Sequence, residues 1–187
     1  MDDKTSLLIQ NLLWTINQPK EGSPSLFEKN IYMILDGARN KKIYSRIKEH
    51  SRDVYTCLYE GRLPEPLRFA APYLVELHKD DFTRWLLKEA WGDSWGIFLI
   101  ANTTISSVRR HLRRFLIVEG PNNKQMYFRY YDPRVFRTYL PSCNPEELDT
   151  IFGPIESFIL EDEDPKRMIH FTRKDFELES KFIELKF

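Results

Sequence analysis

Four short apolar runs in the first hundred residues constrain the fold of this chain more than any other feature of its sequence. Each run is six residues long, which is typical of a buried strand and too short for a helix. Segments with helical spacing of apolar residues lie between several of the runs. The alternation predicts an α/β fold in which helices flank a mixed β-sheet. The predicted strands are residues 30–35, 54–59, 72–77 and 95–100.

A β-hairpin and a second, smaller lobe are predicted further along the chain. The apolar stretches 115–118 and 126–131 flank a turn-forming segment that contains Gly, Pro and two Asn residues. Apolar residues become sparser beyond Ser142, so we expect an N-terminal lobe of residues 1–141 and a smaller, mostly helical or mixed lobe of residues 142–187. The remaining expected elements are helices at 6–17, 41–50, 82–91, 103–112, after Pro133 and at 145–152, and strands at 155–160 and 168–172.

Composition excludes several classes of protein. The 187 residues are 42% hydrophobic and 14% aromatic, which is enough for a core without disulfides or metals and excludes disorder. The 28 basic residues balance the 28 acidic ones. A net charge of zero argues against a protein that coats nucleic acid or an anionic membrane.

The sequence carries no targeting signal that we can identify. Residues 1–4 lack a basic cluster, and the apolar stretch 7–16 is interrupted by polar residues, so neither a signal peptide nor a membrane span is predicted. We therefore expect a cytoplasmic protein. In that compartment Cys57 and Cys143 are expected to be reduced, although spacing alone leaves a disulfide between them open.

The charged residues are segregated along the chain. Residues 105–138 contain eight basic residues, seven of them Arg, and two acidic ones, whereas residues 139–164 contain eight acidic residues and no basic one. In one interpretation the two segments neutralise each other across a contact between the lobes. In the other, part of the arginine surface is left for a partner, because Arg favours bidentate pairing and is enriched at interfaces.

Catalytic, metal and cofactor sites are not predicted. The four histidines lie at positions 50, 78, 111 and 170, far from each other and from any pair of cysteines, and no glycine-rich phosphate loop is present. The segment 92–96 has the spacing of a nucleophile elbow around Ser94, but it lies between a helix and a strand, the reverse of the order that the elbow requires. Residues 161–164 are interpreted as solvated carboxylates.

An ordered set of motifs resembles a known bacterial family. The set consists of Tyr-Met-Ile-Leu-Asp-Gly-Ala at 32–38, Ala-Pro-Tyr-Leu-Val-Glu-Leu at 71–77, His-Leu-Arg-Arg-Phe at 111–115 and Phe-Arg-Tyr-Tyr-Asp-Pro-Arg-Val at 128–135, followed by Leu-Pro at 140–141 and Phe-Gly-Pro at 152–154. From about Tyr32 to about Leu160 the chain resembles the type VI secretion effector chaperones, also called Tap or TEC adaptors. The resemblance implies a cytoplasmic non-enzyme that binds a toxic effector and helps to load it onto the spike protein VgrG.

Within this resemblance we divide the notable residues into two groups. Asp132 is expected to pair with Arg113 or Arg114 and to lock helix, hairpin and loop together, while the remaining arginines and nearby rings are equally suited to an effector contact or to packing. The predicted structural motif residues are Asp36, Gly37, His111, Asp132 and Pro133. The predicted partner-binding residues are Arg110, Arg113, Arg114, Tyr131, Arg134, Phe136 and Tyr139.

Two other functions compete with the adaptor. A single-stranded nucleic-acid-binding module would use segment 109–137, where Arg109, Arg110, Arg113 and Arg114 accompany the aromatic pairs 127–128 and 130–131. It predicts salt-sensitive oligonucleotide binding. A hydrolase built around Ser94, or around His78 with the nearby aspartates, predicts an activity that disappears when His78 is replaced by Ala.

Overall fold

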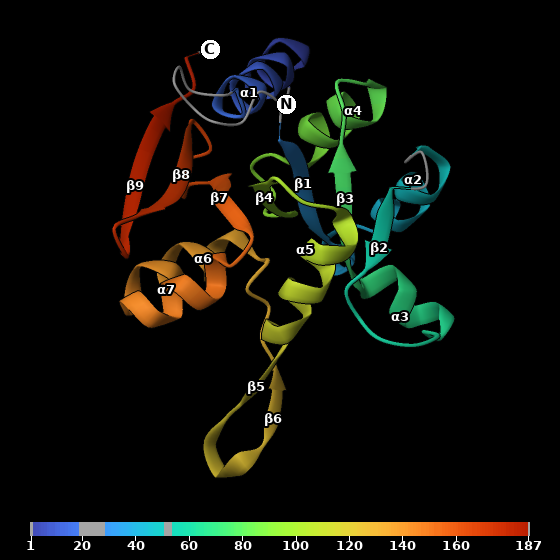
Figure 1. Ribbon diagram of the computed structural model, residues 1–187. Helices are drawn as coiled ribbons and strands as arrows, with labels where there is room; N and C mark the ends of the chain where they lie inside the picture. The colour runs from blue at the N-terminus through green and yellow to red at the C-terminus, as the bar shows by residue number, and fades with distance from the viewer. Residues whose placement is uncertain (1, 19–28, 51–53, 187) are drawn as a thin grey trace.

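A seven-stranded sheet runs through the molecule in the order β2-β3-β1-β4-β7-β8-β9. The computed structural model describes residues 2–18, 29–50 and 54–186 (Figure 1). A separate two-stranded hairpin, β5-β6, projects from one end of the body. The strands are β1 (Asn30–Asp36), β2 (Tyr55–Cys57), β3 (Pro72–Leu77), β4 (Gly96–Ala101), β5 (Ile117–Glu119), β6 (Gln125–Tyr127), β7 (Ile155–Glu161), β8 (Arg167–Lys174) and β9 (Glu177–Glu184).

Helices cover both faces of the sheet. Apolar residues of α1, α2 and α4 join the core on one face, and those of α5, α6 and α7 join the core on the other. The α-helices are α1 (Asp3–Ile16), α2 (Lys42–His50), α3 (Glu65–Ala70), α4 (Asp81–Ala90), α5 (Ile105–Leu112), α6 (Pro133–Tyr139) and α7 (Pro145–Phe152). Short 3-10 turns are η1 (Gly37–Arg39), η2 (Arg113–Phe115), η3 (Pro121–Asn123) and η4 (Leu140–Ser142).

Strand β1 explains why the central strands are continuously apolar. Its side chains alternate between the faces, with Ile31, Met33 and Leu35 in the core under α1 and α4 and Tyr32 and Ile34 in the core under α5 to α7. All five are almost fully buried. A strand that is covered on both faces has no side exposed to solvent. Its sequence is therefore a continuous apolar run and not an alternation of apolar and polar residues.

The α/β class, with helices flanking a sheet, is confirmed, but the strands pair differently from the mixed sheet that we expected. Every pairing between the described strands is antiparallel. Strands β3 and β4 both lie antiparallel to β1, one on each side of it, and are joined by α4. Strands β3 and β4 therefore run in the same direction and are linked by a crossover through α4, but they do not pair with each other because β1 lies between them.

The predicted elements are largely present. Helix α1 and strands β1, β3, β4, β7 and β8 lie where the sequence places them, and β2 is shorter than its apolar run. The hairpin is also shorter, because residues 128–131 leave the strand. Strand β9 was not predicted, since its exposed sequence is rich in charged residues. The boundary near Ser142 stays a prediction, and the sheet continues across it through the pairing of β4 with β7.

Helix starts follow their capping residues. The Asp80 carboxylate accepts a hydrogen bond from the Thr83 amide at 2.9 Å and caps α4. Asn144 and Glu147 form a reciprocal capping box at the start of α7. These local contacts fix where α4 and α7 begin.

The acidic segment 161–164 is not uniformly solvated, which corrects the sequence interpretation for its first residue. Glu161 is buried and accepts hydrogen bonds from the Gly92 amide at 2.6 Å and from the amide and hydroxyl of Ser94 at 2.7 and 2.9 Å. Burial raises the pKa of this carboxyl. Glu161 thus stabilises the turn between α4 and β4, in which Ser94 has a positive φ of 55°.

Two features are absent from the part of the chain that the structure describes. None of its helices has the length and apolar character that crossing a membrane requires. It also holds no group of three or more metal-ligating side chains. Both cysteines are free thiols.

Candidate partner-binding site

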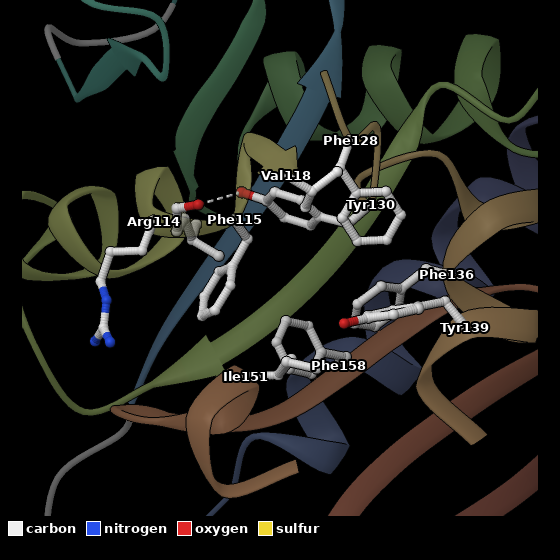
Figure 2. A pocket seen from close by; sticks show the side chains of 10 residues that line it. Arg114, Phe115, Val118, Phe128, Tyr130, Phe136, Tyr139, Ile151 and Phe158 are labelled. Carbon is white, nitrogen blue, oxygen red and sulfur yellow. Dashed lines mark hydrogen bonds between the residues drawn. The ribbon is translucent and has the colours of Figure 1, made fainter. Parts of the chain in front are cut away.

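A small cavity lined mainly by aromatic side chains lies between the base of the hairpin and helices α5 to α7. Its volume is about 80 Å³. Figure 2 shows rings turned toward a common space, with Ile151 of α7 beside them, while the Arg114 side chain extends away from the rings. The aromatic lining residues are Phe115, Phe128, Tyr130, Phe136, Tyr139 and Phe158.

The cavity walls are held by contacts between rings from different elements. Phe128 stands edge-on to Tyr139 with ring centroids 4.7 Å apart, and Phe136 lies 4.9 Å from Phe158. The Tyr130 hydroxyl donates a hydrogen bond to the Leu112 carbonyl at 2.9 Å. Burial raises the pKa of Tyr139 to about 12. The tyrosines of the wall are therefore neutral and add no charge to the cavity at physiological pH.

The hairpin β5-β6, which projects from the body of the protein in Figure 1, carries exposed apolar side chains. Tyr127 is 69% exposed, and its ring contacts Tyr59 at a centroid distance of 5.4 Å. On the opposite side of the hairpin, Val118 lines the cavity and is paired with Met126. The four exposed apolar residues of the hairpin are Ile117, Val118, Met126 and Tyr127.

Most arginines of the basic segment are engaged, but their partners differ from those expected. Among the described residues of this segment, only Arg137 pairs with the acidic segment, through Glu163 at 3.0 Å. The contact between lobes therefore does not neutralise the two segments. Arg113 pairs with Glu60 of the β2–α3 loop, and Arg109 donates to the Cys57 carbonyl at 2.8 Å.

Two arginines of this segment have neither an ion pair nor a side-chain hydrogen bond to another described residue. Arg110 is exposed in the last turn of α5, and Arg114 is exposed in η2 at the rim of the cavity. Their spacing of four residues suits two charges on one side of a helical segment. Both belong to the predicted partner-binding set, and they keep the free guanidinium groups that this role requires.

The other predicted partner-binding residues are less available. Tyr131 and Phe136 are buried, at 2% and 1% exposure, so neither offers surface in this conformation. Arg134 is half exposed but bound to Asp132. Tyr139 is partly buried in the cavity wall.

Asp132 has a different partner from the one predicted. Its carboxylate binds the Arg134 guanidinium at 2.6 and 2.9 Å and accepts a hydrogen bond from the Arg134 amide, which caps α6. The expected pair of Asp132 with Arg113 or Arg114 is wrong. An N-cap side chain lies next to the first turn of its own helix, so Asp132 binds Arg134 instead of an arginine on another helix. Pro133 occupies the first position of α6, where the missing amide hydrogen has no cost.

The motif at the end of β1 anchors the segment that leads from the hairpin to α6. The buried Asp36 carboxylate accepts a hydrogen bond from the Ala38 amide and forms an ion pair with Arg129. A Cβ atom at Gly37 would lie 2.6 Å from the Phe69 carbonyl oxygen, so only glycine fits there. The buried Asp36 carboxylate thus joins the motif at 32–38 to Arg129, next to the cavity residues Phe128 and Tyr130.

His111 connects α5 to the end of α7. Its Nε2 hydrogen bond to the Ile151 carbonyl measures 2.7 Å, and the carbonyl can only accept, so Nε2 carries the hydrogen. Burial lowers the pKa of this imidazole. Gly153 has a positive φ of 47°, and a Cβ there would lie 2.3 Å from the histidine ring. This contact places Ile151 in the cavity wall.

The candidate catalytic residues Ser94 and His78 lie on different elements and contact different partners. The Ser94 hydroxyl donates to Glu161, and His78 lies 3.8 Å from Glu76. Ser94 is buried within the α4–β4 turn, whereas His78 is exposed at the end of β3. The histidine and the serine therefore have separate partners, and among the described residues the buried carboxylate is the one base bonded to the serine.

Sequence reasoning missed several residues of the cavity. Val118 was assigned only to a hairpin strand, and Phe158 only to a strand of the second lobe. The sequence did carry one signal for these residues, which is the apolar character of both hairpin strands. Apolar and polar residues do not alternate along them, so neither face of the hairpin is marked as a solvent face.

Comparison with known proteins gives one match. The family model described as "Domain of unknown function (DUF4123)" matches residues 31–150, which contain β1 through most of α7. Searches of curated proteins and of solved structures found no match.

Proposed function

The chain belongs to the DUF4123 family, and from this membership we propose that it is an adaptor that binds a type VI secretion effector and brings it to the VgrG spike. The family is associated with effector adaptors of this secretion system. The matched residues include α5, the hairpin and α6, which supply most of the cavity lining.

The observation that carries the proposal is the exposed apolar hairpin. Two pairs of apolar residues stand opposite each other across β5 and β6, and all four side chains are at least 36% exposed. A two-stranded hairpin on its own is only marginally stable in water, and exposed apolar surface of this kind marks protein contacts. The hairpin of this protein is therefore assigned to binding another polypeptide.

The proposed adaptor has no catalytic activity of its own. In support of this, the Ser94 hydroxyl is bonded to the carboxylate that holds its turn, and the His78 imidazole faces a different glutamate. A nucleophile needs an adjacent base that is itself correctly oriented. The described residues near Ser94 supply no such histidine.

The nucleic-acid-binding alternative has less support. Binding of single strands needs exposed rings for base stacking beside cationic groups. Tyr130 and Tyr131 are buried, and Arg109 and Arg113 are occupied by Cys57 and Glu60. Tyr127 is the hairpin ring that is left exposed, so a stacking platform of several rings is not available.

The adaptor is tested by co-purification. A tagged chain, expressed in its own bacterium with the secretion genes active, is expected to recover the product of a neighbouring gene that carries a toxin domain, together with a spike protein. Mass spectrometry identifies both. Recovery of neither, with both genes expressed, would overturn the proposal.

A pair of matched variants ties the binding to the hairpin. Met126→Ser is expected to reduce effector recovery, because it removes an apolar side chain that is 44% exposed on the same hairpin face as Val118. Phe182→Ser removes a ring of β9 that is 56% exposed and is expected to leave recovery unchanged. Equal recovery by both variants would place the effector elsewhere, and binding of an oligonucleotide that declines with salt would favour the alternative.

A further inference from the structure

We propose that the cavity at the base of the hairpin accepts one aliphatic side chain from a short segment of the bound protein, with a neighbouring carboxylate of that segment paired to Arg114. The proposal rests on the adaptor function and names the chemistry of its docking segment. It follows from three observations: the size of the cavity, the free charge at its rim and the apolar surface that continues from it.

The size of the cavity selects the kind of side chain. Its volume of about 80 Å³ is roughly half that of an apolar cavity that takes up benzene. A tryptophan or tyrosine ring is therefore too large, whereas the branched end of a leucine, isoleucine or valine fits. The walls consist of aromatic rings and aliphatic groups, and the Tyr130 hydroxyl is already hydrogen-bonded to the Leu112 carbonyl. None of the described lining residues has a buried polar atom without a hydrogen-bond partner, so the cavity does not need a water molecule to satisfy one.

The rim of the cavity selects the charge of the segment. Arg114 extends from the rim into solvent, and Arg110 lies one helical turn before it (Figure 2). Neither has an acidic partner among the described residues, unlike Arg113, Arg129, Arg134 and Arg137 in the same stretch. A guanidinium group pairs with a carboxylate in bidentate geometry, so an acidic residue next to the aliphatic one is the complementary partner.

The apolar surface outside the cavity gives the segment a path. Val118 lines the cavity and is 36% exposed, and Met126, its partner across the hairpin, is 44% exposed. Paired residues of an antiparallel hairpin point to the same face. Ile117 and Tyr127 therefore point to the other face, where Tyr127 contacts Tyr59. The docking face is thus that of Val118 and Met126.

The test uses the purified full-length chain and a phage-displayed library of random 12-residue peptides. Selected peptides are then synthesised and titrated by calorimetry. We expect the enriched peptides to share one leucine, isoleucine or valine with an aspartate or glutamate within four positions. Enrichment of basic or tryptophan-rich peptides instead would overturn the proposal.

Four variants locate the binding. Val118→Trp fills the mouth of the cavity, and Ile117→Trp places the same ring on the other face of the same strand. We expect Val118→Trp to weaken the selected peptides about tenfold or more and Ile117→Trp to leave them within about twofold. Arg114→Glu is expected to weaken them about tenfold, whereas Lys181→Glu on β9 has no effect. Equal affinities for the two tryptophan variants would contradict the proposal.

The outcomes also separate this proposal from the adaptor function. If Val118→Trp abolishes self-association of the chain, seen by sedimentation, a second copy is the occupant and the proposal is wrong. If the effector still co-purifies fully with Val118→Trp, the adaptor stands and the docking site is wrong. If no effector is recovered but the peptides bind as expected, the docking site stands and the adaptor is wrong. If near-ultraviolet circular dichroism shows that Val118→Trp does not fold, the Arg114→Glu variant, which changes an exposed residue, is used in its place to test whether the peptides bind at the cavity.

Discussion

Gly153, which ends α7, is constrained both by its own backbone conformation and by a neighbouring side chain. Its backbone (φ 47°, ψ −115°) is unfavourable for any residue with a side chain, and His111 fills the space of a Cβ atom. The histidine ring cannot easily move, because it is bonded to Ile151 and stands edge-on to Phe115 at 5.1 Å. One glycine thus holds the relative position of α5 and α7.

Gly153→Ala is expected to lower the free energy of unfolding by about 2–4 kcal/mol, through backbone strain and overpacking together. Gly61→Ala is the matched control, because Gly61 also has a positive φ, of 72°, but no atom lies within 4 Å of the position that its Cβ atom would take. The control is expected to lose about 1 kcal/mol. Urea unfolding measures both values, and equal losses would show that the histidine contact contributes nothing.

His111 also predicts a pH dependence of stability. Burial lowers the pKa of its imidazole in the folded protein below the ordinary value of 6.5. The unfolded chain therefore binds a proton at this residue before the folded one does, and stability is lost as the pH falls below 6.5 toward the folded pKa. The loss is about 1.4 kcal/mol for each unit by which the pKa is lowered.

The matched variant is His111→Gln, whose amide can donate to Ile151 but does not titrate. The stability advantage of the natural protein over this variant is expected to shrink between pH 7 and pH 5, as measured by urea unfolding at each pH. An advantage that stays constant over this range would mean that the folded and unfolded imidazoles titrate alike.

At the scale of elements, the ion pair of Asp36 and Arg129 joins the end of β1 to the segment between β6 and α6. The Asp36 side chain is 1% exposed, so removal of Arg129 leaves a buried carboxylate with the Ala38 amide as its remaining side-chain bond among the described residues. Breaking such a buried pair costs about 3–5 kcal/mol. Because Arg129 itself is 45% exposed, we expect the lower end of this range for Arg129→Ala.

Arg84→Ala breaks a pair with Asp81 on the surface of α4 and serves as the control, with an expected loss below about 1 kcal/mol. Thermal unfolding compares the two single variants. The double variant Asp36→Asn/Arg129→Ala is expected to lose less than the sum of its single variants, because the neutral amide no longer needs the cation. Additive losses would show that the two side chains do not interact.

The sequence predicted the positions of helices and strands better than it predicted which of them lie next to each other in the fold. Apolar runs identified β1, β3 and β4 because these strands are buried on both faces. The predictions for the pairing of Asp132 and for the solvation of Glu161 were wrong, since both depend on which element lies next to the residue in space. The cavity could not be predicted for the same reason: Phe115 and Phe158 belong to different lobes in the sequence and meet only in the fold.

At the scale of the molecule, the sheet and the cores on both of its faces span the expected lobe boundary. Strand β7 pairs with β4, and Phe136 on one side of residue 142 packs against Phe158 on the other. Separating the two parts would expose both of these buried rings and the edge of β4. The two lobes are therefore expected to unfold together.

Heating is expected to give one cooperative transition in calorimetry, with equal calorimetric and van't Hoff enthalpies. A fragment of residues 1–141 is expected to remain unfolded or to bind a hydrophobic dye, because β4 loses its pairing with β7 and keeps only that with β1. Two separate transitions, or a fragment with native-like dispersion in its NMR spectrum, would show that the boundary near Ser142 divides independent domains.

The separation of the hairpin from the cores of the sheet has an evolutionary consequence. Ile117 and Met126 are exposed and take no part in either core, so substitutions there leave the folding of the body unaffected. Gly37, Asp36 and Gly153 allow no such freedom. Lineages that acquire new cargo can therefore diversify the hairpin rapidly while the frame beneath it stays constant, and sequence variation among relatives is expected to concentrate between residues 117 and 127.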